Sequence, residues 1–445
     1  MKKILVLTLA ALMVVTLVAC ASGGSGSNKK VELRVLHYID MSSAGAAEEL
    51  DVVWKAFDEA HPNITVNRED EFNDPFHDSV DAYAAAGTLP DVMYCWPSGR
   101  STTLHTQKLL KDLGPLAARD NLSNNYSSIV LDPSQQAGGY MGMLAQGITS
   151  TNTFIANKEV LSAVGLTPAK TYSELVAQVP VLKAAGYETI LMPNKDTWVM
   201  QSCLFSLVAG RFMGEGWEQD ILSGARDFND PDFVAALNFI KTMYDDGVLE
   251  QSSLAIDYGD GPGLFSTNKA AYYIDGDWRV GAFITDASTG VALITPDRQT
   301  NFEISVFPDI DVPGVKFNRS NSDIVGTGWG INAKLEGDKL EAAWTLVKWL
   351  VGKEVQTFRL RTGGISNPSW KGIDFNSLPL EPMQKELANL SSKYDKSTIV
   401  IDGPFADVVY TPINDGLQAM GIGTQTAADV AKLTQEALDN WKKTQ

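Results

Sequence analysis

VELRVL at residues 31–36 alternates apolar and polar side chains and predicts a β-strand, and ITV at 64–66 and DVMY at 91–94 predict two more. Apolar residues recur at the spacing of one helix face over residues 50–57, and a second helix is expected over about 74–86. The resulting order is strand, helix, strand, helix, strand, which implies parallel strands joined by right-handed crossovers. The sequence therefore predicts an α/β fold.

Ligands of open α/β sheets bind at the carboxyl ends of the strands. The loops that follow the three predicted strands are therefore the first places to look for a binding site. They contain Tyr38 and Asp40, then Asn73, and then Trp96. These residues are the first candidates for ligand contact.

A second unit of strands and helices begins near residue 147. Short apolar runs mark its strands, and apolar stripes at helical spacing mark two late helices. The expected elements are strands at residues 153–156, 189–192 and 270–274, and helices at residues 339–351 and 426–441.

The first twenty residues have the pattern of a secretory signal. Met1-Lys2-Lys3 is followed by an uncharged run over residues 4–19, too short to span a bilayer, which takes about 20 apolar residues. The run ends at Leu17-Val18-Ala19-Cys20, which resembles the lipobox of bacterial lipoproteins. We therefore expect a signal peptide at 1–19, and a lipidated Cys20 with a flexible tether at 20–30. An ordinary signal peptide that happens to carry a cysteine is the alternative.

Charge and cysteine content exclude several classes of partner. The chain has 54 acidic against 36 basic residues and a formal charge of −18, which argues against nucleic acid because phosphate binding needs clustered Lys and Arg. Cys95 and Cys203 lie in apolar surroundings, so we expect two separate buried thiols rather than a disulfide. No CxxC or Cys/His spacing is present, and we expect no metal and no cofactor.

Motifs for catalysis are missing from the sequence. None of the four histidines forms an HExxH pair, and no G-x-S-x-G or Walker A pattern occurs. A glycosidase carboxylate pair stays open, because that pair is defined by its separation in space. We expect a binding protein rather than an enzyme.

Tryptophan positions point toward a sugar. Trp96, Trp198, Trp278 and Trp329 follow predicted strands or lie among Pro, Gly, Asp and Asn. A flat indole suits the apolar face of a pyranose ring, whose hydroxyls need polar partners around the edge. Packing of each indole under its own loop is the alternative. Acidic and amide side chains next to strand ends supply the candidate acceptors: Asp40, Asn73, Asp196, Asp275 and Asp277.

Several motifs together resemble one family over residues 31–445. They are GTLPDV at 87–92 with Trp96 behind it, AYYIDGDW at 271–278, GWGIN at 328–332, AAW at 342–344 and GGIS at 363–366. In this order they resemble the extracellular solute-binding proteins of ABC importers, in particular the large, maltose-binding-protein-like carbohydrate-binding group.

The resemblance implies a two-lobed periplasmic-binding-protein-like fold with a hinge and a central ligand cleft. The crossovers between lobes are expected near residues 146–151 and before Gly328. One lobe would then comprise 31–148 plus about 327–375, and the other 149–326 plus about 376–445.

The resemblance also implies roles for individual residues. Trp96 and Trp278 match stacking tryptophans of the family, and Trp198 matches an aromatic that follows an acid, here Asp196. A late aromatic of the family maps onto Phe405 or Tyr410, whereas Tyr38 and Asp40 are carried over only by loop position. Maltose-binding protein has an acid three residues beyond its stacking tryptophan, and this chain has Gly99 there, which argues against maltose itself.

The expected function is that of a substrate-binding lipoprotein of an ABC transporter. It would capture a carbohydrate, with an oligosaccharide favoured, and deliver it to the permease subunits by lobe closure. It would act as a monomer outside the cytoplasm, anchored through Cys20 to the outer face of the bacterial cell membrane. A secreted carbohydrate-active enzyme and a surface sensor or adhesion lipoprotein are the alternatives.

Overall fold

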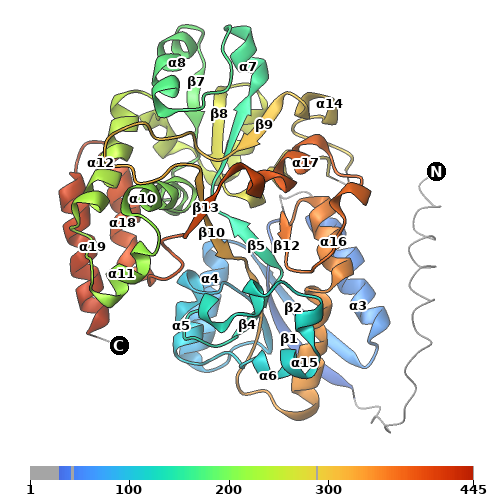
Figure 1. Ribbon diagram of the computed structural model, residues 1–445. Helices are drawn as coiled ribbons and strands as arrows, with labels where there is room; N and C mark the ends of the chain where they lie inside the picture. Colours follow the sequence, from blue (N-terminus) through green and yellow to red (C-terminus); the bar gives the residue numbers. More distant parts are fainter. Residues whose placement is uncertain (1–29, 42–44, 287–288, 444–445) are drawn as a thin grey trace.

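The computed structural model describes residues 30–41, 45–286 and 289–443 (Figure 1). Cys20, the signal peptide and nearly all of the tether predicted from the sequence lie outside the described residues. The chain forms two α/β lobes, one above the other in Figure 1, joined by strands that run between them. No helix in the described ranges is both long enough and apolar enough to cross a membrane.

The first lobe is built on a sheet with the strand order β2-β1-β3-β11-β4. β1 pairs in parallel with both β2 and β3, as the alternation of strands and helices predicts. β11 returns from the far part of the chain and runs antiparallel to β3 and β4. The strands are β1 Val31–Tyr38, β2 Ile64–Glu71, β3 Val92–Cys95, β4 Met143–Ala145 and β11 Gly328–Ile331.

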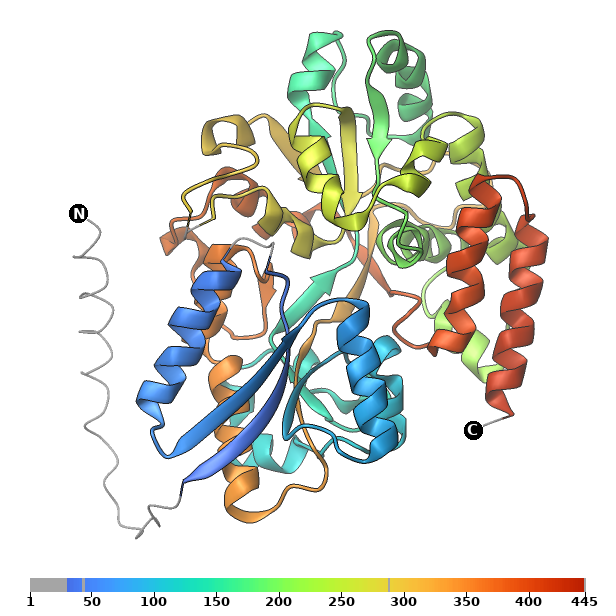
Figure 2. The same cartoon turned by 180° about the vertical axis from the view of Figure 1, so that it is seen from behind.

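Helices cover this sheet on both faces (Figure 2). The first of them runs through a π-helical turn at Leu50–Trp54, which joins α2 to α3. Apolar side chains of β1, β3, β11 and α15 form one buried core between the layers. The helices are α2 Ala46–Glu49, α3 Lys55–Ala60, α4 Asp74–Ala86, α5 Thr102–Thr106, α6 Gly114–Arg119, α15 Gly337–Leu350 and α16 Lys353–Thr362.

The second lobe is built on a sheet with the strand order β7-β8-β6-β9. β7 and β8 are parallel, while β6 is antiparallel to β8 and β9. The strands are β6 Thr153–Asn157, β7 Glu188–Leu191, β8 Ala270–Asp275 and β9 Phe302–Ser305.

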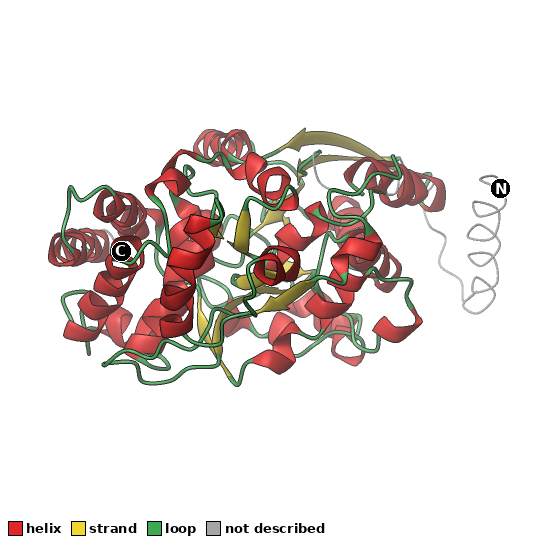
Figure 3. Ribbon diagram, turned by 90° about the horizontal axis from the view of Figure 1, so that it is seen from above, coloured by secondary structure: helices red, strands yellow, loops and turns green. Residues whose placement is uncertain are grey.

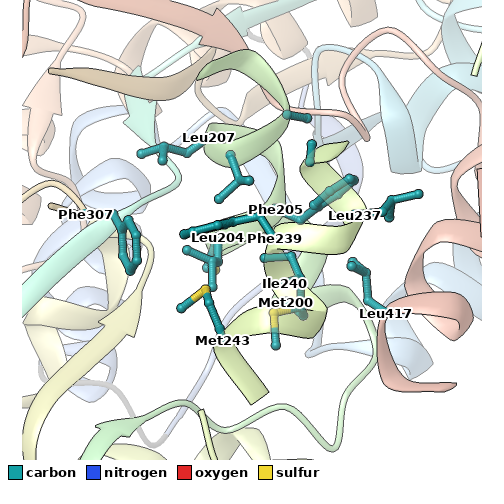
Figure 4. Close-up of a cluster of buried hydrophobic side chains, with 14 of the residues drawn as sticks. Met200, Leu204, Phe205, Leu207, Leu237, Phe239, Ile240, Met243, Phe307 and Leu417 are labelled. Atoms are coloured by element: carbon teal, nitrogen blue, oxygen red, sulfur yellow. The ribbon is translucent and has the colours of Figure 1, made fainter. Parts of the chain in front are cut away.

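The helices of the second lobe enclose its core, and Figure 3 shows several strands near the middle of the molecule between groups of helices. Figure 4 shows side chains of α10 and α12 packed with Phe307 and Leu417. The helices are α7 Lys158–Ala163, α8 Tyr172–Ala184, α9 Trp198–Met200, α10 Ser206–Met213, α11 Trp217–Ser223, α12 Pro231–Asp245, α13 Gly261–Ser266, α14 Pro296–Gln299, α17 Pro382–Ala388, α18 Asp407–Gly421 and α19 Ala427–Lys442.

A third sheet, which we call the hinge sheet, lies between the lobes and has the order β12-β5-β10-β13 (Figure 1). β5 and β10 pair antiparallel and connect the two larger sheets. In the chain, β5 lies between β4 of the first sheet and β6 of the second, and β10 lies between β9 and β11. The strands are β5 Gly147–Ser150, β10 Ser320–Val325, β12 Asn367–Pro368 and β13 Lys396–Ile399.

The two cysteines of the described chain are free and buried, as predicted. Cys95 belongs to the core of the first lobe and Cys203 to the core of the second. Because each thiol lies in a different core, the two cannot pair.

Candidate ligand-binding site

A cavity of about 310 Å³ lies between the two lobes, against the hinge sheet. Side chains of both lobes and of the strands that join them form its wall. The sequence-predicted residues that line it are Tyr38, Asp40, Asn73, Trp96, Trp198, Asp277 and Trp278.

The first lobe contributes an aromatic wall. Tyr38 ends β1, and Tyr94 and Trp96 lie at the end of the neighbouring strand β3, so their side chains meet at one edge of the sheet. The ring of Tyr38 stacks on Tyr94 with centroids 5.6 Å apart and meets Trp96 edge-on at 5.1 Å. Phe72 and His77 extend this wall.

Burial, together with the nearby Arg100 charge, lowers the pKa of His77 to about 3, so its imidazole is neutral.

The second lobe contributes the opposite aromatic wall, made of Trp198, Tyr258 and Trp278. The Trp198 ring lies 4.9 Å from Tyr258 and 6.3 Å from Trp278, between centroids. Trp278 Nε1 donates to the Tyr258 hydroxyl over 2.6 Å, which fixes the indole. Gly276 makes room for that indole, because a Cβ there would lie 2.1 Å from the Trp278 ring.

Two arginines reach across the space between the lobes. The Arg279 guanidinium lies 3.7 Å from a carboxylate oxygen of Asp40, which belongs to the first lobe. Arg279 also donates to the Tyr258 carbonyl oxygen over 2.6 Å. Arg100, from the first lobe, lies 5.9 Å from the centroid of the Trp198 ring. The contacts with Asp40 and with Trp198 therefore pair a charged donor of one lobe with a group of the other.

Asp277 connects the cavity with the hinge. It lines the cavity and accepts hydrogen bonds from the Ser150 N–H at 3.0 Å and from the Ser366 hydroxyl. Ser150 ends the crossover strand β5, and Ser366 precedes β12. Burial raises the pKa of Asp277 to about 7, with the nearby charge of Asp323 acting in the same direction.

Trp329 does not line the cavity, and its prediction as a site residue needs correction. The side chain is fully buried in the first-lobe core, where its ring lies 5.4 Å from Tyr94 and 5.6 Å from His37. The physical reason is that the rings of His37, Trp54 and Tyr94 pack around the indole and leave none of it exposed. The indole therefore supports the aromatic wall from behind.

Two predicted acids also lie outside the cavity wall. Asp275 is fully buried and accepts from the hydroxyls of Tyr258 at 3.1 Å and Tyr273 at 2.9 Å. Asp196 accepts from the Tyr258 N–H at 3.2 Å. Both carboxyls hold Tyr258 in place instead of facing a ligand, because that tyrosine needs polar partners where it is buried.

The late aromatics predicted in the second lobe, Phe405 and Tyr410, pack in the core of that lobe. Phe405 has no exposed surface and contacts Trp217 and Phe228 with ring centroids 6.1 and 5.2 Å away. Tyr410 is likewise buried, on α18. Neither side chain lines the cavity.

Several lining residues were not predicted from the sequence, among them Tyr94, Arg100, Tyr258, Arg279 and Asp402. Tyr94 could have been found, because alternate residues of a strand share a face and Trp96 lies two positions further on. Tyr258 begins a three-residue 3-10 helix, Tyr258–Asp260, which is too short to show a periodic pattern in the sequence. Among the described residues, no group of three or more His, Cys, Asp or Glu side chains is arranged to hold a metal ion.

The fold and the cavity between its lobes define the class of two-lobed binding proteins that enclose a small ligand. A profile of the family described as bacterial extracellular solute-binding protein matches residues 53–374. The chain belongs to this family of bacterial extracellular solute-binding proteins. Among curated proteins, none matches the sequence significantly.

Solved structures confirm the two-lobed fold. A protein of Caldanaerobius polysaccharolyticus, from work on xylan utilization, has a TM-score of 0.80 at 18% identity, over 91% of this chain and 99% of its own. A chitin oligosaccharide binding protein has a TM-score of 0.80 at 19% identity, over 92% and 98%. Maltose-bound MalE3 of T. maritima has a TM-score of 0.72 at 20% identity, over 92% and 100%.

Proposed function

We propose that this protein is the carbohydrate-capturing component of an ABC importer. The observation that carries the proposal is the pair of aromatic walls, one from each lobe, that line a single cavity. Tyr38 and Trp96 stand in one wall, and Trp198 and Trp278 stand in the other. Aromatic faces of this kind bind the apolar faces of sugar rings. Because the indoles come from both lobes, they can contact one ligand together only when the lobes have closed on it.

Polar groups around the same cavity suit the edge of a sugar. Arginines supply donors, and carboxylates and the Asn73 amide supply acceptors, which together match hydroxyl groups that both donate and accept. Both signs of charge are present, with Arg100 and Arg279 against Asp40 and Asp402, so a neutral ligand fits without an unpaired charge. The names of the similar structures, which refer to chitin oligosaccharide, maltose and xylan utilization, support the same ligand class.

Transport would follow from lobe closure. Residues 31–148 with about 327–375 would move as one lobe, against 149–326 with about 376–445. A sugar favours the closed form because only there do both walls contact it. The closed form would then deliver the sugar to the permease subunits, and no catalytic step is needed.

The setting follows from the family and the N-terminal sequence. Solute-binding proteins of this family are extracellular. A lipid on Cys20 and the tether up to residue 30 would hold this monomer on the outer face of the membrane, close to its permease. Labelling of the full-length protein with a fatty-acid probe tests the anchor, and a Cys20→Ala variant should lose the label and be released from membranes.

A thermal-shift screen tests the ligand class. A ligand that binds only the native state stabilises it and so raises the unfolding temperature. At a ligand concentration one hundred times the dissociation constant, the stabilisation is about 2.7 kcal/mol. We expect a shift with at least one neutral sugar, accompanied by a change in tryptophan fluorescence and by no reaction product. A panel without any shift, or a sugar converted to product, would refute the proposal.

A further inference from the structure

We propose that the cavity takes a saccharide of one or two sugar units and that the closed protein excludes longer chains. This inference rests on the proposed function, and it narrows the oligosaccharide expected from the sequence to its shortest members. Two places where the backbones of the two lobes touch carry the argument, one at each end of the cavity.

The first contact joins the segment after β3 to the segment after β13. The Gly99 N–H donates to the Gly403 carbonyl oxygen over 3.2 Å. A Cβ added at Gly99 would lie 1.8 Å from the carbonyl oxygen of Asp402, so the two backbones leave no room for a side chain. Ser98, Arg100 and Asp402, which flank this contact, line the cavity. The cavity therefore ends where these backbones meet.

The second contact joins the turn that contains Gly281, in the second lobe, to the end of α16 in the first. A Cβ at Gly281 would lie 2.6 Å from the Gly363 carbonyl oxygen, and a Cβ at Gly363 would lie 2.6 Å from the Gly281 Cα. Both glycines and the adjacent Gly364 line the cavity. Backbone therefore borders the cavity at this end as well.

Each contact includes a glycine that is close in sequence to one of the two edge strands of the hinge sheet. Its strand order is β12-β5-β10-β13, and Gly363 precedes β12 whereas Gly403 follows β13. The cavity is lined between them by β5 and by the end of β10. A linear ligand that lies across the hinge sheet consequently meets backbone at both of its ends.

The size of the cavity agrees with this geometry. Its volume is about 310 Å³. It lies at the low end of the range of about 300–1,000 Å³ for small-molecule pockets. One or two sugar rings fill the space between the aromatic walls. A third ring would have to push apart the backbones at one of the two glycine contacts.

Calorimetric titration of the purified chain with sugars of increasing length tests the inference. The probes are the xylose, glucose (α-1,4-linked) and N-acetylglucosamine series from one to six units, together with galactose. In the series that binds, we expect the tightest binding at one or two units, and a loss of about tenfold or more for each unit beyond. Affinity that rises through three to six units would overturn the inference.

A glycine variant tests the contact itself. Gly281→Ala adds a methyl group whose nearest neighbours are backbone atoms of Gly363 in the other lobe, and it should weaken binding of the best short sugar by about tenfold. Gly263→Ala is the matched control, because a Cβ at this position of the same lobe has nothing within 4 Å. It should bind like the wild type. Equal affinity of Gly281→Ala and wild type would show that the contact does not limit the ligand.

The outcomes separate this inference from the proposed function. Binding that is tightest for long chains refutes the length limit and leaves carbohydrate capture intact. Failure of every sugar in the panel to bind refutes carbohydrate capture, and the length limit falls with it. The length series uses the wild-type chain, so its result does not depend on whether a variant folds.

Discussion

Trp278 and Trp329 both lie within two residues of a glycine at or next to a strand, yet their surroundings differ. Trp278 is half-buried in the cavity wall and hydrogen-bonded to Tyr258, whereas Trp329 is fully enclosed in the first-lobe core. The first is placed to bind a ligand and the second to stabilise the fold. Substitution separates the two roles.

We expect Trp278→Ala to weaken sugar binding by about tenfold or more, because an aromatic stack with its buried area contributes about 1–3 kcal/mol. Its unfolding midpoint in urea should stay near that of the wild type. Trp329→Ala should instead lose about 3–5 kcal/mol of stability through the cavity it leaves. Titration calorimetry and urea unfolding measure the two effects, and unchanged affinity of Trp278→Ala would contradict the assignment.

Asp277 makes stability depend on pH. Its pKa is raised to about 7 in the folded chain, against about 3.9 for an unperturbed aspartate. Between these values the native state holds a proton that the unfolded state has lost, so stability falls as pH rises from about 4 to 7. Asp277→Asn removes this proton while keeping an acceptor for Ser150.

The unfolding temperature of Asp277→Asn, minus that of the wild type, should therefore increase from pH 5 to pH 8. The contributions of the other titrating groups to the pH dependence are the same in both proteins and cancel in this difference. Parallel profiles for the two proteins would mean that Asp277 is already ionised in the fold at pH 5.

At the scale of elements, periodicity located the helices and strands well. The helix expected over about 74–86 is α4, Asp74–Ala86, and the strand expected at 270–274 is contained in β8, Ala270–Asp275. The strand expected at 64–66 is longer, because polar residues up to Glu71 continue the parallel ladder along β1. That extension depends on a partner strand, which local sequence does not contain.

α16 ties the first helix to the hinge through Arg359, and this buried contact was not predicted. The Arg359 guanidinium lies 2.6 Å from a carboxylate oxygen of Glu49 and donates a hydrogen bond to the side-chain oxygen of Gln146, which precedes β5. Arg359→Gln would leave the Glu49 carboxylate buried without its partner, so we expect a loss of about 3–5 kcal/mol in urea unfolding. Arg319→Gln is the control, because its ion pair with Asp395 is exposed and should contribute less than about 1 kcal/mol. Equal losses would refute the distinction.

At the scale of the whole molecule, closure should be visible in solution. The Asp40–Arg279 pair joins the two lobes at 3.7 Å and exists only when they approach. We expect sugar to reduce the radius of gyration in small-angle X-ray scattering. Asp40→Asn should weaken binding by about fivefold, because a partly buried pair contributes about 1 kcal/mol.

A double-mutant cycle of Asp40→Asn and Arg279→Gln isolates the effect of the Asp40–Arg279 ion pair on affinity from the other contributions of each residue. The two substitutions together should cost less than the sum of their separate effects on affinity. Strictly additive effects would show that the pair does not contribute to closure.

The sequence by itself determined the order of strands and helices and the α/β class, and it predicted four of the aromatic side chains that line the cavity, Tyr38, Trp96, Trp198 and Trp278. It could do so because periodicity and strand ends are local properties of the chain. Tertiary structure decided which candidates face the cavity: it placed Trp329, Asp275 and Phe405 in the cores, and it brought Tyr258 and Arg279 to the cavity wall. It also decided where the cavity ends, because Gly99 and Gly281 close it only through contact with backbone that is distant in sequence. Contacts between lobes depend on how whole elements pack, and the local pattern of residues does not specify that packing.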